Sequence, residues 1–230
     1  MEPASYDQPA IRPALAWVTA VLAGIVAPAI ALTLLAEGAA PGAQAGAVAA
    51  LLAVGMMGGG MISASIAGRF WLGIGLALMA GAALLVLAGI LEMPGASVPL
   101  SIALIMLIAS ISFAARGTLF ARSGAGRGWW IAVFVVGGEG AMLLTAWAMP
   151  GALPEWLLVL LPAQWASMAV QSALGGNGIL AASSALIALG GTAAATLLVW
   201  RLWPRRWPYA IMFTTWIGLS ALVWHWPVAI

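Results

Sequence analysis

The sequence contains no cysteine and no lysine, and only one histidine, His225. Without cysteine there are no disulfides, thiolate metal sites, iron–sulfur clusters or thioether links to haem. Without lysine there is no Schiff base to retinal or pyridoxal phosphate. A single histidine cannot supply a bis-histidine haem or a histidine metal cluster. We therefore expect no cofactor and no metal site.

Charged residues are scarce as well, and hydrophobic residues predominate. Hydrophobic residues make up 64% of the 230 residues and charged residues only 6%, whereas charged residues are about a quarter of a soluble domain. The apolar runs reach the roughly 20 residues that a membrane-spanning helix needs, and they lack the alternation of barrel strands. The sequence therefore predicts an all-α, polytopic integral membrane protein, with residues 1–230 in a single transmembrane domain.

Short segments rich in proline, glycine or charge divide the chain into apolar blocks. Seven blocks are predicted to span the membrane, near residues 14–36, 43–67, 71–92, 98–115, 129–149, 179–200 and 207–228. A further block, 154–174, is long enough to span but carries Pro162, Gln164 and Gln171. Its placement depends on the distribution of the arginines.

Arginines are expected to gather on the cytoplasmic side of a membrane protein. If block 154–174 does not span, all eight arginines fall on one side, whereas a spanning block would leave five inside and three outside. We therefore predict a cytoplasmic N-terminus and an interfacial or re-entrant helix at 154–174 on the outer face. The predicted cytoplasmic basic cluster consists of Arg116, Arg122, Arg127, Arg201, Arg205 and Arg206. Short loops and the arginine-only basic set indicate a bacterial inner membrane.

Small residues recur at helical spacing. Gly55 and Gly59 form a GxxxG pattern, and Gly73, Ala77 and Gly81 follow one ridge, which predicts close packing between helices or an interface with a second copy of the chain. The patch GMMGGGM, residues 55–61, is either a hinge or a tightly packed segment, and we favour tight packing.

One carboxyl group stands inside an apolar run. In VVGGEGAML, residues 135–143, Glu139 lies about 15 Å along its helix from the cytoplasmic end, close to the bilayer midplane. Two interpretations remain open. A protonated Glu139 could hydrogen-bond Ser110, Ser112, Thr214 or a backbone carbonyl and join helices, or an ionisable Glu139 could face a polar pathway for protons or substrate.

One segment resembles a known family. LLPAQWASMAVQSALGGNGILAASSALIALGGTAAATLLVWRLWPRR, residues 160–206, is similar to the end of ABC-2 type permeases, with an outer-face helix that opens with Leu-Pro and a Trp, a Gly-rich turn, and a returning span that ends in cytoplasmic arginines. The resemblance implies an export permease that works with a separate ATPase subunit. The chain departs from the family in the tight turn AGRFW, residues 67–71, which leaves no room for a cytoplasmic coupling helix, and in an extra span after Arg206.

No nucleophile motif, phosphate-binding loop, carboxylate pair or metal spacing appears at any span end, so we do not expect an enzyme. We expect an integral membrane subunit of a transport system, such as an export permease for a lipid-like or amphipathic substrate. The alternative is a non-catalytic structural or assembly subunit of a larger membrane complex. The expected partners are the lipid bilayer and other membrane or ATPase subunits, or a homo-oligomer, but no nucleic acid.

Overall fold

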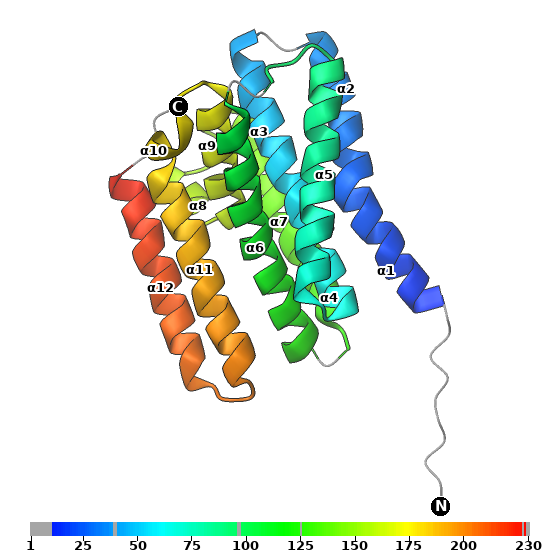
Figure 1. Ribbon diagram of the computed structural model, residues 1–230, viewed down its shortest axis with the longest axis vertical. Helices are drawn as coiled ribbons and strands as arrows, with labels where there is room; N and C mark the ends of the chain where they lie inside the picture. The colour runs from blue at the N-terminus through cyan, green and yellow to red at the C-terminus, as the bar shows by residue number, and fades with distance from the viewer. Residues whose placement is uncertain (1–10, 39–40, 96–97, 125, 227, 229–230) are drawn as a thin grey trace, which may run out of the picture.

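Long apolar helices, packed side by side, make up the fold (Figure 1). The computed structural model describes residues 11–38, 41–95, 98–124, 126–226 and 228. Within these residues all regular secondary structure is helical, and six helices are long and apolar enough to cross a membrane. The predicted class, an all-α membrane protein, is therefore confirmed.

The first spanning helix carries an irregular turn in its middle. Helix α1 (Ile11–Val21) continues through a π-helical turn, η1 (Leu22–Val26), into α2 (Ala27–Gly38). Pro28 lies just after this turn and has no N–H to donate to the carbonyl of Gly24, four residues earlier. The turn therefore lies where the sequence interrupts the regular hydrogen-bond ladder.

The second spanning helix is the most enclosed, with 83% of its apolar window buried. It comprises α3 (Pro41–Met57), the π-helical turn η2 (Gly58–Ile62) and α4 (Ser63–Ala67). A Cβ atom on Gly58 would lie 2.7 Å from the backbone carbonyl of Ala23, and one on Gly60 would lie 2.8 Å from the Cβ of Ala77. The glycine patch is thus a place where neighbouring helices pack directly against backbone, as the tight-packing interpretation requires.

Three further spans follow with short connections. These are α5 (Phe70–Ile90), α6 (Pro99–Ser123) and α7 (Gly128–Ala148). Gly68 makes the turn before α5 with a φ of 63°, a backbone conformation that glycine adopts without strain. Helix α6 continues to Ser123, although the predicted span ended at 115. Arg116 therefore lies about two helical turns inside α6, whereas Arg122, another predicted member of the cytoplasmic cluster, lies in its last turn.

Block 154–174 is not a single helix on the surface of the bundle. It forms α8 (Glu155–Val159) and α9 (Pro162–Leu174), followed by the short α10 (Gly178–Ala181). Most of α9 is buried against α3, α6 and α11, and Trp165 is fully buried. The shallow interfacial placement is not seen, because α9 carries small residues, Ala163, Ala166, Ala169 and Ala173, that are buried and let neighbouring helices approach closely.

The first residues of α9 lie in the middle of the bundle. Ala163 contacts Glu139, whose neighbour Gly140 packs against Val54, deep in α3. At the other end of α9, Gln171 lies beside Gly46, near the start of α3. Helix α9 therefore runs from mid-bundle back toward the end of the bundle from which α8 descends (Figure 1).

Two antiparallel helices complete the bundle, α11 (Ser183–Leu202) and α12 (Trp207–His225). The seventh predicted span is thus helical, but α12 is not among the six that are apolar enough to cross a membrane. Its Trp, Pro, Tyr and His residues lower its apolar character. The C-terminal ends of α4, α6 and α11 lie at one end of the bundle, together with the start of α1 (Figure 1).

Candidate functional site

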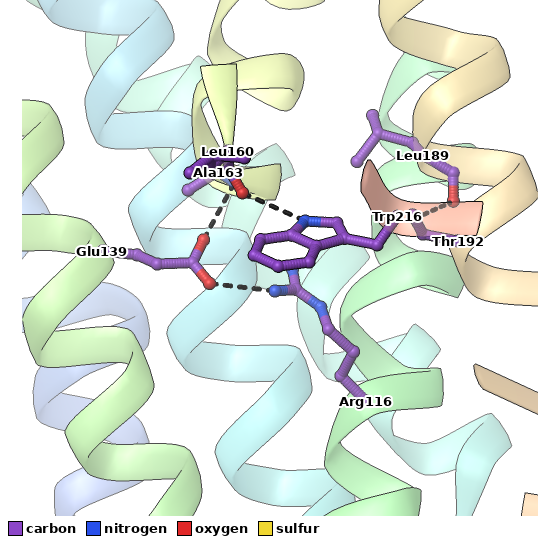
Figure 2. Close-up of polar contacts among 7 residues, drawn as sticks. All are labelled: Arg116, Glu139, Leu160, Ala163, Leu189, Thr192 and Trp216. Atoms are coloured by element: carbon purple, nitrogen blue, oxygen red, sulfur yellow. Dashed lines mark hydrogen bonds and ion pairs between the residues drawn. The ribbon is translucent and has the colours of Figure 1, made fainter. Parts of the chain in front are cut away.

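A buried ion pair joins α6 to α7. Arg116 Nη1 donates to Glu139 Oε1 over 2.9 Å, and the two side chains are only 15% and 11% exposed. It is the only salt bridge among the residues that the structure describes. Figure 2 shows the guanidinium of Arg116 reaching up to the carboxylate of Glu139. The intramembrane carboxyl group that the sequence singled out therefore has a cationic partner.

The geometry of two antiparallel helices brings these side chains together. Arg116 lies seven residues before the end of α6, or about 10 Å, and Glu139 lies eleven residues after the start of α7, or about 16 Å. Side chains in a helix lean toward its N-terminus. The Arg116 side chain therefore leans toward the middle of the bundle, and the Glu139 side chain leans toward Arg116. The long arginine side chain closes the remaining distance.

The second oxygen of the carboxylate binds the N-terminus of α9. The backbone N–H of Ala163 donates to Glu139 Oε2 over 3.0 Å, and no side chain of α9 itself caps this end. The first N–H groups of a helix have no partner inside the helix, and the helix dipole favours an anion there. Glu139 therefore caps a helix that starts in mid-bundle and neutralises Arg116 with the same carboxylate.

Two tryptophans hold the break between α8 and α9. Trp216 Nε1, on α12, donates to the carbonyl of Leu160 over 3.1 Å, and Trp165 Nε1 donates to the carbonyl of Val159 over 2.7 Å. An interrupted helix leaves carbonyl groups without intrahelical partners, and such groups are costly to bury unpaired. Figure 2 shows the indole of Trp216 next to the Arg116–Glu139 pair. We call these residues, Arg116, Glu139, Ala163, Leu160 and Trp216, the mid-bundle site.

Several buried polar atoms around the mid-bundle site have no hydrogen-bond partner. Arg116 Nε and Nη2 are buried and have no hydrogen-bond partner among the described residues, and the same holds for Ser112 Oγ, one helical turn earlier on α6. Buried polar groups are almost always paired with protein or with water. The site therefore has donors available to a polar group that enters it.

The predicted partners of Glu139 were wrong. Ser110 Oγ donates to the carbonyl of Met106, and Thr214 Oγ1 donates to the carbonyls of Ala210 and Ile211. Ser112 makes no bond to Glu139. Short hydroxyl side chains bond most easily to the preceding turn of their own helix. Ser110 and Thr214 do so, whereas Ser112 Oγ has no partner among the described residues. The guanidinium of Arg116, at the end of a longer side chain, reaches across to α7.

One signal in the sequence could have identified Arg116. After Gly117 and Thr118 the sequence continues with the apolar residues Leu119, Phe120 and Ala121 and reaches no further Gly or Pro before Gly124. A charged residue followed by a further helical turn of apolar residues lies inside a span as readily as at its end. The other predicted cluster members do lie at helix ends, at the arginine-rich end of the bundle: Arg122, Arg127, Arg201, Arg205 and Arg206.

Metal ligation has no support in the described part of the chain, where no group of three or more His, Asp or Glu side chains comes together. The chemistry of the mid-bundle site is instead that of a charged pair, a helix N-terminus and free N–H donors. No protein-family model, curated protein or solved structure matches this chain.

Proposed function

We propose that the chain is the integral membrane subunit of a transport system that moves a lipid-like or amphipathic substrate and works with a separate ATPase. In this proposal it resides in a bacterial inner membrane, with the N-terminus in the cytoplasm and α12 as a seventh span. Blocks α8 and α9 form a re-entrant hairpin that enters from the outer face. The chain itself catalyses no reaction.

The mid-bundle site carries the proposal. Ionisable side chains are costly inside a membrane, and those that occur there mark substrate or proton pathways more often than they serve packing. A buried ion pair adds little stability compared with apolar residues of the same size. Helix–helix adhesion alone could use a neutral side chain, so the Arg116–Glu139 pair is better explained as a pair that opens and closes.

The hairpin supports the same function. In membrane transporters, helices that start or stop inside the bilayer often bring a helix N-terminus to the substrate site. Here the N-terminus of α9 lies beside Arg116, and Glu139 occupies it. An anionic group on a substrate would find a helix N-terminus and the unused Arg116 donors once Glu139 moved away.

The resemblance to ABC-2 type permeases adds to this. Helix α9 begins after Leu161 with Pro162 and carries Trp165, a turn with Gly175 and Gly176 follows, and α11 ends with Arg201 in its last turn. The two departures persist, because only Gly68 and Arg69 separate α4 from α5 and α12 follows α11. Engagement of an ATPase would therefore use the arginine-rich end rather than a coupling helix.

A structural role is the second candidate. Both oxygens of Glu139 are bonded within the chain, and these bonds join α6, α7 and α9, as adhesion between helices would. In addition, α12 exposes Ile211, Phe213 and Ile217 along its length. An assembly subunit would pack such a face against partner helices.

Co-purification distinguishes the two candidates. The chain is extracted from its native membrane into lipid nanodiscs, and its stoichiometric partners are identified by mass spectrometry. A soluble ATPase at fixed stoichiometry, with ATP-dependent movement of a fluorescent lipid in reconstituted vesicles, is the expected result. An unrelated multisubunit complex without an ATPase would instead establish the structural role.

A further inference from the structure

The arginine-rich end of the bundle has a groove between α4, α6 and α11. Gly68, Thr118, Ala121, Arg122 and Trp200 line it, and its volume is about 470 Å³. The groove is shallow and open to its surroundings. The groove is on the far side of Thr118 from the mid-bundle site and shares no residue with it.

Arg122 is held in place in this groove. Its Nη1 donates to the backbone carbonyl of Trp200 over 2.9 Å, and its guanidinium carbon lies 5.2 Å from the centre of the Trp200 ring. Both contacts join α6 to α11 and restrict an otherwise flexible side chain. A guanidinium has five N–H donors, so one bond to a carbonyl leaves most of them for a ligand, and Arg122 forms no ion pair with any described residue.

The charge around the groove is of one sign. Arg69, Arg127, Arg201, Arg205 and Arg206 are exposed at the same end of the bundle. The acidic residues in the described ranges lie elsewhere: Glu139 is in mid-bundle, Glu155 is the first residue of α8, and Glu37 and Glu92 lie at the ends of α2 and α5, at the opposite end of the bundle. The groove therefore favours an anion.

The neighbouring tryptophans indicate which anion. Trp71, just after the Gly68 turn, is 79% exposed, and Trp130 and Trp207 are also exposed, each near the start of its helix at this end. Exposed tryptophans at the ends of membrane helices mark the level of lipid headgroups. The groove thus opens where phosphates of the bilayer lie, and basic pockets between helices on the cytoplasmic side are known to hold anionic headgroups.

We propose that this groove binds the phosphate headgroup of an anionic phospholipid, with the Arg122 guanidinium as its principal donor. The lipid chains would lie along the outside of α5, next to Trp71. Bound there, the lipid would bridge α4, α6 and α11 at the arginine-rich end. This site does not depend on the proposed transport function.

Native mass spectrometry of the delipidated chain tests the site, with phosphatidylglycerol and phosphatidylcholine as probes. We expect the unmodified chain to retain phosphatidylglycerol preferentially. Arg122→Gln should weaken this binding at least about fivefold, because it removes the charged hydrogen-bond donors that line the groove. Arg127→Gln removes the same charge from the α6–α7 turn, outside the groove, and should change binding less than twofold.

A second variant keeps the charge and blocks the space. Ala121→Phe places a ring in the groove and should also abolish the preference for phosphatidylglycerol, with unchanged thermal unfolding as the check on folding. Equal binding by Arg122→Gln, equal weakening by Arg127→Gln, or equal retention of phosphatidylcholine would overturn the proposal. Displacement of the lipid by millimolar inorganic phosphate would identify a free-anion site, and failure to bind phosphatidylglycerol at all would also overturn the proposal.

Discussion

Arg116 on α6 and Glu139 on α7 form an ion pair of 2.9 Å whose carboxylate also caps the N-terminus of α9. One side chain therefore ties three helices together in mid-bundle. Loss of either charge leaves the other buried and unpaired, which costs more than the pair contributes when intact.

The charged pair should show strong energetic coupling. In Glu139→Gln the buried Arg116 loses its counter-ion, and in Arg116→Gln the same happens to Glu139. We expect Glu139→Gln and Arg116→Gln each to lower the free energy of unfolding by roughly 3 kcal/mol. The double variant should lose clearly less than the sum, as is usual for contacting residues. Unfolding in nanodiscs, followed by tryptophan fluorescence, measures this, and additive losses would mean that the pair is not formed.

The bond from Trp216 to Leu160 should keep the α8–α9 break closed. Trp216→Phe retains an aromatic ring but removes the N–H donor, so we expect a loss of about 1 kcal/mol. Hydrogen exchange of residues 158–164 should become faster, while most of α9 stays as protected as α11 because it is buried. Trp224→Phe, on the exposed part of the same helix, is the control. Rapid exchange throughout α9 in the unmodified protein would contradict the buried placement.

The glycine patch should not tolerate a methyl group. Gly58→Ala places Cβ 2.7 Å from the Ala23 carbonyl, where backbone has to move, and overpacking of this kind costs about 1–3 kcal/mol. Gly75→Ala, in α5, meets nothing within 4 Å and should stabilise the helix by up to about 1 kcal/mol. Thermal unfolding of the two variants gives the comparison. A harmless Gly58→Ala would indicate a mobile hinge instead of close packing.

The topology can be tested because the chain has no cysteine of its own. Cysteines introduced at Arg122 and Arg205 should resist a membrane-impermeant thiol reagent added to intact spheroplasts. A cysteine at Glu155, an exposed residue seven positions after the end of α7, should react. Labelling at 205 together with protection at 122 would place an additional crossing between them, and α8 and α9 would then span the membrane instead of re-entering.

The class of the fold was determined by the sequence itself, because the free energy of transfer into hydrocarbon adds up residue by residue along each run. The lengths of the spans followed from the same sum, although α6 passed its expected end, since an isolated arginine does not stop a helix when its long side chain finds a partner.

Only the tertiary structure decided which polar groups contact one another. Arg116 and Glu139 are 23 residues apart, and neither local sequence indicates that the two residues form a pair. Their contact depends on the antiparallel packing of α6 against α7. Likewise, the apolar block at 154–174 was evident, but its burial was not, because whether an apolar helix faces lipid or protein depends on which neighbours surround it, and α3, α6 and α11 come from distant parts of the chain.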